Sequence, residues 1–207
     1  MLDYEKHIYE QGYSLVVGCD EAGRGPLCGP VVCACCILPV DYQNEMIDDS
    51  KKLTEKKREV LFEEIKKVAL FYKIIAIEPE EIDRINIYEA SRKGMTEAIL
   101  QCGARPDYIL TDCMPLFGFE GIPQENLVKG DAKAQSIAAA SILAKVTRDH
   151  LMEEIDLKYP QYNIKKHKGY PTKEHLELLK KYGPIKGLYR YSYKPVKDLE
   201  QVQLKLF

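Results

Sequence analysis

The stretch Gly18-Cys-Asp-Glu-Ala-Gly-Arg-Gly-Pro-Leu-Cys-Gly29 decides the fold of this chain. Two adjacent carboxylates, Asp20 and Glu21, end an apolar run, and a glycine-rich turn with one arginine follows directly. This order predicts a strand that ends with acidic groups at its tip. The turn that follows would bring backbone without side chains close to a ligand. Gly23 and Gly25 permit that approach because they carry no side chain. Carboxylates gathered at a strand end are the ligands that hard divalent cations need.

An isolated Asp-Glu pair is more often a solvated turn, but its neighbours argue against that reading. Residues 15–17 are apolar and lead into the pair, and residues 31–38 form a second apolar run after Pro30. The acids therefore sit between two segments that we expect to be buried. Neighbouring residues of a strand face opposite ways, so Asp20 and Glu21 can share one site only if the strand has already ended there.

Hydrophobic patterning predicts an α/β protein with a mixed sheet covered on both faces. The expected strands are residues 15–19, 31–38, 73–77, 108–111 and 126–128, and the expected helices lie at about 55–68, 87–102, 134–155 and 172–182. Thr54 is the expected N-cap of the first of these helices.

The bulk composition is that of an ordinary globular chain of 207 residues, with 45% hydrophobic and 30% charged residues. No apolar stretch approaches the ~20 residues of a membrane helix, and the N-terminus lacks a signal-peptide layout. We therefore expect one domain and a cytoplasmic location. The seven cysteines lie mostly in apolar segments without metal-ligand spacing, which predicts reduced, buried thiols.

Two further acids follow the same pattern as the first pair. Asp112 ends the apolar run 108–111, and Asp131 directly precedes the long expected helix. Taken singly, Asp131 reads as a helix cap. If the segment ends converge, however, Asp20, Glu21, Asp112 and Asp131 form one cluster. Two like charges ~4 Å apart repel by about 4 kcal/mol at an effective dielectric of ~20, so bound divalent cations are the natural resolution.

The net charge of -2 hides a basic segment between Lys158 and Lys197. That segment holds eleven Lys and Arg against Glu174 and Glu177, together with seven of the fourteen tyrosines. Basic groups interleaved with aromatic rings suit a phosphate backbone with sugars or bases to stack on. The alternative is a solvated helical surface with tyrosine rings packed beneath it.

Three motifs together resemble ribonuclease HII, the type 2 ribonuclease H family. They are the stretch 18–29, the run Lys129-Gly-Asp-Ala-Lys133 with the Ala-rich residues 136–149 after it, and Lys168-Gly-Tyr-Pro-Thr-Lys-Glu-His175. The resemblance spans roughly residues 15–196. It implies a ribonuclease H-like fold, with a mixed five-stranded sheet flanked by helices in a single domain over residues 1–207. A helical substrate-binding region at about 158–197 and a tail at 198–207 would complete that domain.

The resemblance also implies the site. The family's metal-binding acids match Asp20, Glu21, Asp112 and Asp131, and the expected cofactor is Mg²⁺ or Mn²⁺, with two ions per site. Hydrolysis by a water molecule that these ions activate would leave a 5′-phosphate and a 3′-hydroxyl. Cleavage by 2′-hydroxyl attack would instead want a histidine acid–base pair, and no such pair is evident.

The family uses its Gly-Arg-Gly turn, here Gly23-Arg24-Gly25, to read the 2′-hydroxyl that distinguishes RNA from DNA. Its motif tyrosine, here Tyr170, packs against the sugar on the DNA side of an RNA–DNA junction. The remaining candidates are three phosphate contacts and two matched serines without an assigned role: Lys51, Lys52, Lys145, Ser50 and Ser141. Each of these residues also has a simpler interpretation. The glycines could only form a tight turn, Tyr170 could be a core residue, and the lysines could be solvated.

Two features of the C-terminal part are notable. The family often has His-Arg-x-Ser-Phe where this chain has Tyr189-Arg-Tyr-Ser-Tyr193, which puts in doubt any role of a histidine there. The end of the chain, Gln203-Leu-Lys-Leu-Phe207, looks like the short motif by which bacterial replication proteins dock on the sliding clamp. A tail folded back on its own core is the alternative.

The sequence therefore predicts a metal-dependent endoribonuclease that acts on RNA–DNA hybrids and on single ribonucleotides in duplex DNA. Ribonuclease HIII is the nearest competitor, but it usually carries an extra N-terminal domain and a glutamate where this chain has Asp131. A non-catalytic hybrid-binding module could have lost an acid, and a structural α/β protein would not explain the basic tyrosine-rich segment.

Overall fold

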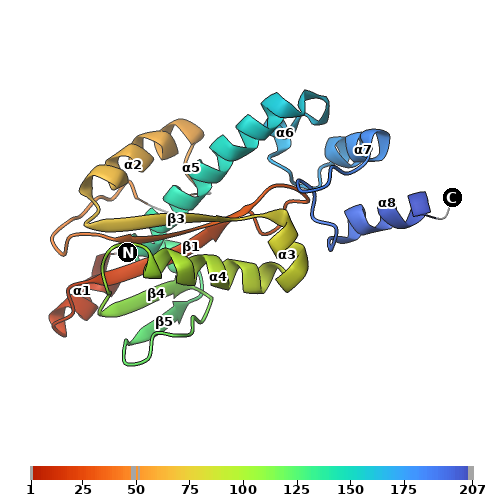
Figure 1. The fold of residues 1–207 in the computed structure, drawn as a ribbon. Helices are drawn as coiled ribbons and strands as arrows, with labels where there is room; N and C mark the ends of the chain where they lie inside the picture. Colours follow the sequence, from red (N-terminus) through yellow and green to blue (C-terminus); the bar gives the residue numbers. More distant parts are fainter. Residues whose placement is uncertain (1, 48–49, 51, 205–207) are drawn as a thin grey trace.

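A computed structural model describes residues 2–47, 50 and 52–204 of the chain. Its centre is a five-stranded sheet with the order β3-β2-β1-β4-β5 (Figure 1). The strands are β1 (Val16–Ala22), β2 (Val31–Ile37), β3 (Phe71–Ile77), β4 (Tyr108–Asp112) and β5 (Gln124–Leu127). The three strands β1, β2 and β3 pair antiparallel, whereas β1–β4 and β4–β5 are parallel. The predicted mixed five-stranded sheet is confirmed.

Helices cover both faces of this sheet. They are α1 (Leu2–Glu10), α2 (Glu55–Val68), α3 (Pro79–Ile85), α4 (Ile87–Leu100), α5 (Gln135–Lys158), α6 (Ile164–His167), α7 (Lys173–Tyr182) and α8 (Lys194–Leu204), with short 3₁₀ turns η1 (Gly130–Ala132) and η2 (Pro160–Tyr162). Helices α2 and α5 lie on one face, and α3 and α4 lie on the other (Figure 1). Among the described helices, none is both long and apolar enough to cross a membrane.

Strand β2 shows how the two faces are filled. All seven of its residues are buried. Its odd-numbered side chains pack in the cluster with α4, and its even-numbered ones pack in the cluster with α2 and α5. This two-sided burial explains the uninterrupted apolar run, because successive side chains of a strand point to opposite faces. Three cysteines of β2 take part in this packing, and all seven cysteines are free, with only Cys113 exposed.

Strand β1 corrects one sequence expectation. The acids were expected to follow a strand that had ended, but β1 runs on to Ala22 and keeps pairing with β2. Asp20 lies opposite Ala34, and Glu21 lies opposite Cys33. The two acids therefore stand on opposite faces of a continuous strand.

The C-terminal third is helical, as expected, and has its own core. Helices α6 and α7 pack with the end of α5 around buried residues that include Tyr162, Tyr189 and Val196. Thr54 caps α2 as predicted, and Gly183 ends α7. Helices α1, α3, α6 and α8 were not individually expected. Helix α8 lies beyond α7 toward the C-terminus (Figure 1), so part of the expected tail is helical, and residues 205–207 lie outside the described residues.

Candidate active site

Three carboxylates from separate segments meet at one edge of the sheet. Asp20 comes from β1, Asp112 from the last position of the parallel strand β4, and Asp131 from η1 just ahead of α5. Each offers one oxygen, and these three oxygens all lie within 4.8 Å of one another. The backbone N–H of Gly130 donates to Asp112 Oδ1 over 2.9 Å, which ties the Asp131 turn to the end of β4. The structure thus brings together three of the four predicted acids.

The buried position of Asp20 makes its charge costly. Burial raises the pKa of this carboxyl well above its usual range, and the nearby charges of Glu21 and Asp112 raise it further. Hydrogen bonds from Ser141 and from the backbone N–H of Glu21 offset part of this effect. Oxygen ligands alone, close together and mutually repelling, are a donor set that suits a hard divalent cation. The residues present therefore fit a metal site.

Glu21 stands outside the group of three oxygens because it faces the other side of β1. Its Oε1 atom lies 3.4 Å from Nη1 of Arg24, and the residue lines the same cleft as Asp20. Its charge still raises the pKa of Asp20. A role for Glu21 as a metal ligand stays a prediction.

The two serines without an assigned role support Asp20. Ser141, on α5, hydrogen-bonds the Asp20 carboxylate, and its Oγ atom lies 2.9 Å from the Oγ atom of Ser50. Both serines are buried. They hold the acid in one orientation from the helix side of the sheet.

A cleft of about 230 Å³ joins Asp20 and Glu21 to the glycine-rich turn. Its lining comprises Asp20, Glu21, Ala22, Gly23, Arg24, Gly25, Ser50, Ser141, Lys145, Arg148 and Tyr170. The Tyr170 side chain is 44% exposed here, and a Cβ atom on Gly25 would lie 3.4 Å from its ring. Gly23 has a φ of +100°, and a Cβ there would lie 2.0 Å from Arg148 Nε. Both the conformation and the close approach therefore require glycine at position 23.

The predicted lysines differ in their placement. Lys145 lines the cleft, and its Nζ atom lies 2.6 Å from Asp149 Oδ1. Lys52 is exposed, and Lys51 lies outside the described residues. In the basic segment, Tyr162 and Tyr189 are buried in the core around α6 and α7. Much of the tyrosine pattern therefore reflects packing.

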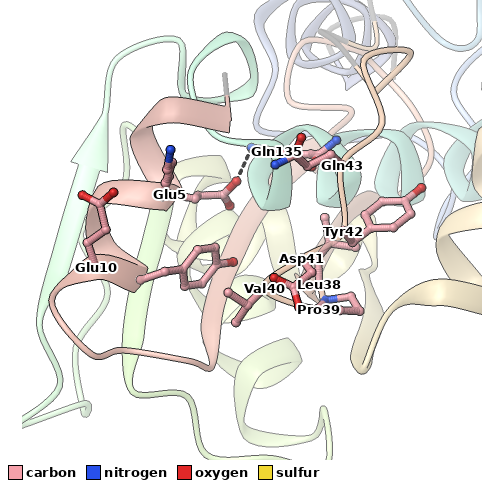
Figure 2. A pocket seen from close by; sticks show the side chains of 11 residues that line it. Glu5, Glu10, Leu38, Pro39, Val40, Asp41, Tyr42, Gln43 and Gln135 are labelled. Carbon is pink, nitrogen blue, oxygen red and sulfur yellow. Dashed lines mark hydrogen bonds between the residues drawn. The ribbon is translucent and has the colours of Figure 1, made fainter.

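One contact near the site has no signal in the local sequence. Helix α5 has no side-chain cap of its own at Ala134. Instead Glu5, on α1, accepts a hydrogen bond from the backbone N–H of Gln135 over 2.8 Å (Figure 2). It also accepts one from the backbone N–H of Ser136 over 2.9 Å. The carboxylate fixes the start of the helix that follows Asp131. The hollow beside it, about 600 Å³ between α1 and the loop after β2, contains none of the predicted site residues.

A mixed sheet of this order, with carboxylates grouped where β1 and β4 lie side by side, is a ribonuclease H-like fold. The family model for ribonuclease HII matches residues 17–196. The chain therefore belongs to the ribonuclease HII family and is an endonuclease of the type 2 ribonuclease H class.

Individual relatives agree with this assignment. Ribonuclease HII of Caldanaerobacter subterraneus is 53% identical over 190 residues, which cover 92% of this chain and 78% of the relative. Among solved structures, ribonuclease H2 of Pyrococcus horikoshii has a TM-score of 0.77 at 28% identity and covers 92% of this chain and 99% of its own. The PCNA–ribonuclease HII complex of Archaeoglobus fulgidus has a TM-score of 0.73 at 28% identity, with 87% and 95% covered.

Proposed function

We propose that this ribonuclease H requires Mg²⁺ or Mn²⁺ and cleaves the RNA strand of RNA–DNA hybrids. It also nicks duplex DNA on the 5′ side of a single embedded ribonucleotide, which makes it an initiator of ribonucleotide excision repair. The products carry a 3′-hydroxyl and a 5′-phosphate. One observation carries the proposal: Asp20, which belongs to the group of three carboxylates, lines the same cleft as the Gly23-Arg24-Gly25 turn.

Asp20, Asp112 and Asp131 are the residues that would hold the cations, with Glu21 beside them. The chemistry that two divalent cations supply at such a site is activation of a water nucleophile and stabilisation of charge on the leaving oxygen. The carboxylates would hold the cations, and Ser141, in contact with Ser50, keeps Asp20 in one orientation. Within the described residues no histidine lines this cleft, which favours a water nucleophile over acid–base catalysis of 2′-hydroxyl attack.

The 2′-hydroxyl would then serve recognition. Gly23 and Gly25 line the cleft without a side chain, so the polar backbone groups of the turn can contact a ribose directly. Tyr170, whose ring lies beside Gly25, offers a half-exposed ring to the neighbouring sugar. Lys51, Lys52 and Lys145 are proposed phosphate contacts.

The test is cleavage of a DNA duplex with one embedded ribonucleotide, assayed with Mg²⁺, with Mn²⁺ and with chelator. The expected result is metal-dependent nicking 5′ of the ribonucleotide, abolished by Asp20→Asn. Activity confined to continuous RNA–DNA hybrids would favour a substrate range like that of ribonuclease HIII. Binding without any cleavage would mean a hybrid-binding module and would refute the catalytic assignment.

We also propose that residues 158–197 form the substrate-binding region of a single catalytic domain and that residues 198–207 form a tail that binds a sliding clamp. The solved Archaeoglobus complex with PCNA supports a clamp partner. Deletion of residues 203–207 should abolish binding to a bacterial clamp and leave nicking unchanged. Clamp binding that survives the deletion would refute the assignment of the tail.

A further inference from the structure

A buried guanidinium holds the glycine-rich turn from behind. The Arg190 side chain is 0% exposed. Its Nη2 atom donates to Gly23 O over 2.7 Å, and its Nη1 atom donates to Arg24 O over 3.0 Å. Two further bonds, of 3.0 and 2.8 Å, go to Gly29 O. One side chain thus fixes both ends of the turn.

A second buried arginine completes the support. Arg148, 1% exposed, donates to Pro30 O over 3.1 Å, to Cys28 O over 3.3 Å and to Lys168 O over 3.1 Å. Burial and the charge of Arg190 lower the pKa of Arg148 to about 10, so the group stays charged at neutral pH. Among the described residues, neither arginine forms an ion pair with a carboxylate. Buried charge is tolerated when it is fully hydrogen-bonded, and here backbone carbonyls supply the acceptors.

The direction of these carbonyls determines the direction of the neighbouring N–H groups. A trans peptide unit is planar, with its C=O and N–H pointing opposite ways. Because Gly23 O and Arg24 O face Arg190, the N–H groups of Arg24 and Gly25 face away from it. Within the described part of the chain, neither N–H donates to a protein acceptor. The turn therefore offers two oriented, unused donors at the cleft that it lines.

We propose that Arg190, supported by Arg148, is a positioning residue that aims these two donors and thereby determines the preference for a 2′-hydroxyl. This inference rests on the proposed function and adds to it the source of its substrate selectivity. Arg190 touches no substrate; it acts through the peptide units of residues 23–25. Lysine cannot replace it, because a single ammonium cannot span the three carbonyls that the planar fork reaches.

Tyr193 provides a milder way to disturb the same contact. Its hydroxyl accepts from Arg190 Nη1 over 3.1 Å and donates to Arg24 O. The hydroxyl therefore adds a second contact between the Arg190 guanidinium and the turn. Tyr193→Phe removes that contact and keeps the ring, which packs beside Arg190.

The experiment measures binding in Mg²⁺, with Asp20→Asn as the common background so that substrates stay intact. Fluorescence anisotropy gives Kd for a duplex with one ribonucleotide and for the same duplex made only of DNA. The added substitutions are Arg190→Lys, Tyr193→Phe and, as a matched control, Arg84→Lys on the exposed surface of α3.

The expected result is a preference for the ribonucleotide that falls about tenfold with Arg190→Lys and about threefold with Tyr193→Phe. Affinity for the all-DNA duplex should stay unchanged, and Arg84→Lys should alter neither value. An unchanged preference in both test variants would overturn the proposal, as would equal weakening on both duplexes. If Arg190→Lys does not fold, Tyr193→Phe decides alone. If the background protein has no preference, the recognition step of the proposed function fails, whichever residue holds the turn.

Discussion

Replacing Asp20 with asparagine should stabilise the metal-free protein while it abolishes cleavage. The carboxylate oxygens of the acidic group lie within 4.8 Å of one another. At an effective dielectric of about 20, each ionised pair at that separation repels by about 3 kcal/mol. Partial protonation already relieves some of this repulsion, because burial raises the pKa of Asp20. We therefore expect a gain of about 1–3 kcal/mol.

The substitution preserves the local contacts. Asparagine keeps an oxygen that can accept from the backbone N–H of Glu21, which lies 2.7 Å from Asp20 Oδ1. For a chain of this length, the gain corresponds to a rise in Tm of about 3–10 °C. Thermal unfolding followed by circular dichroism, in chelator and at neutral pH, measures it. Added Mg²⁺ should then raise the Tm of the wild type, because a ligand that binds only the folded state stabilises it, and should leave the variant almost unchanged.

Asp41→Asn is the matched control, since Asp41 is exposed and is not one of the grouped carboxylates. A surface change of this kind should alter stability by no more than about 0.5 kcal/mol. A lower Tm for Asp20→Asn in chelator would show that the acids are not repelling one another. Full Mg²⁺ stabilisation of the variant would place the metal elsewhere. Either result would refute the reasoning about the site.

Three further predictions concern neighbouring groups. Gly23→Ala should reduce nicking at least tenfold in a steady-state assay, because its Cβ would lie 2.0 Å from Arg148 Nε. Ser141→Ala should lower kcat more than it raises KM, because Asp20 loses a hydrogen bond that orients it; an unchanged kcat would contradict that role. Burial lowers the pKa of His175 to about 4, below about 6.5 in the unfolded chain. Stability should therefore be complete above pH 6.5 and be lost as pH falls toward 4, by about 2 kcal/mol between pH 7 and pH 5. Urea unfolding at the two pH values tests this, and His175→Gln should remove most of the difference.

The sequence predicts the acids better than their surroundings. Asp112 and Asp131 each follow a pattern that is visible over a few residues, because an apolar run ends or a helix begins beside them. The residue at which β1 ends could not be predicted from its local sequence in the same way. The Gly-Arg-Gly turn suggests a strand end at Asp20, but pairing of Ala22 with Val32 on β2 extends the strand. Partners across a sheet are not encoded in the local pattern of either strand.

The supporting residues were missed for a related reason. Arg190 reads as one more cation of a basic segment, yet its acceptors lie 161 to 167 positions earlier in the chain. Glu5 lies 130 positions before the helix that it caps. Nothing in the residues around them separates these side chains from solvated ones. Only the packed structure shows that their charges are buried and hydrogen-bonded to backbone groups.

The buried arginines beneath the turn and the grouped carboxylates together constrain the order in which metal and substrate bind. A phosphodiester is attracted by the arginines beneath the turn and repelled by the acids at the ends of β1 and β4. The repulsion disappears only when cations neutralise the acids, whereas the arginines are charged at all neutral pH values. The turn can therefore engage a ribose before the scissile phosphate is held, but that phosphate can approach Asp20 only with metal present. Substrate affinity measured in chelator then gives the contribution of the turn and the basic segment. The increase in affinity on adding Mg²⁺ gives the contribution of the carboxylates with bound metal.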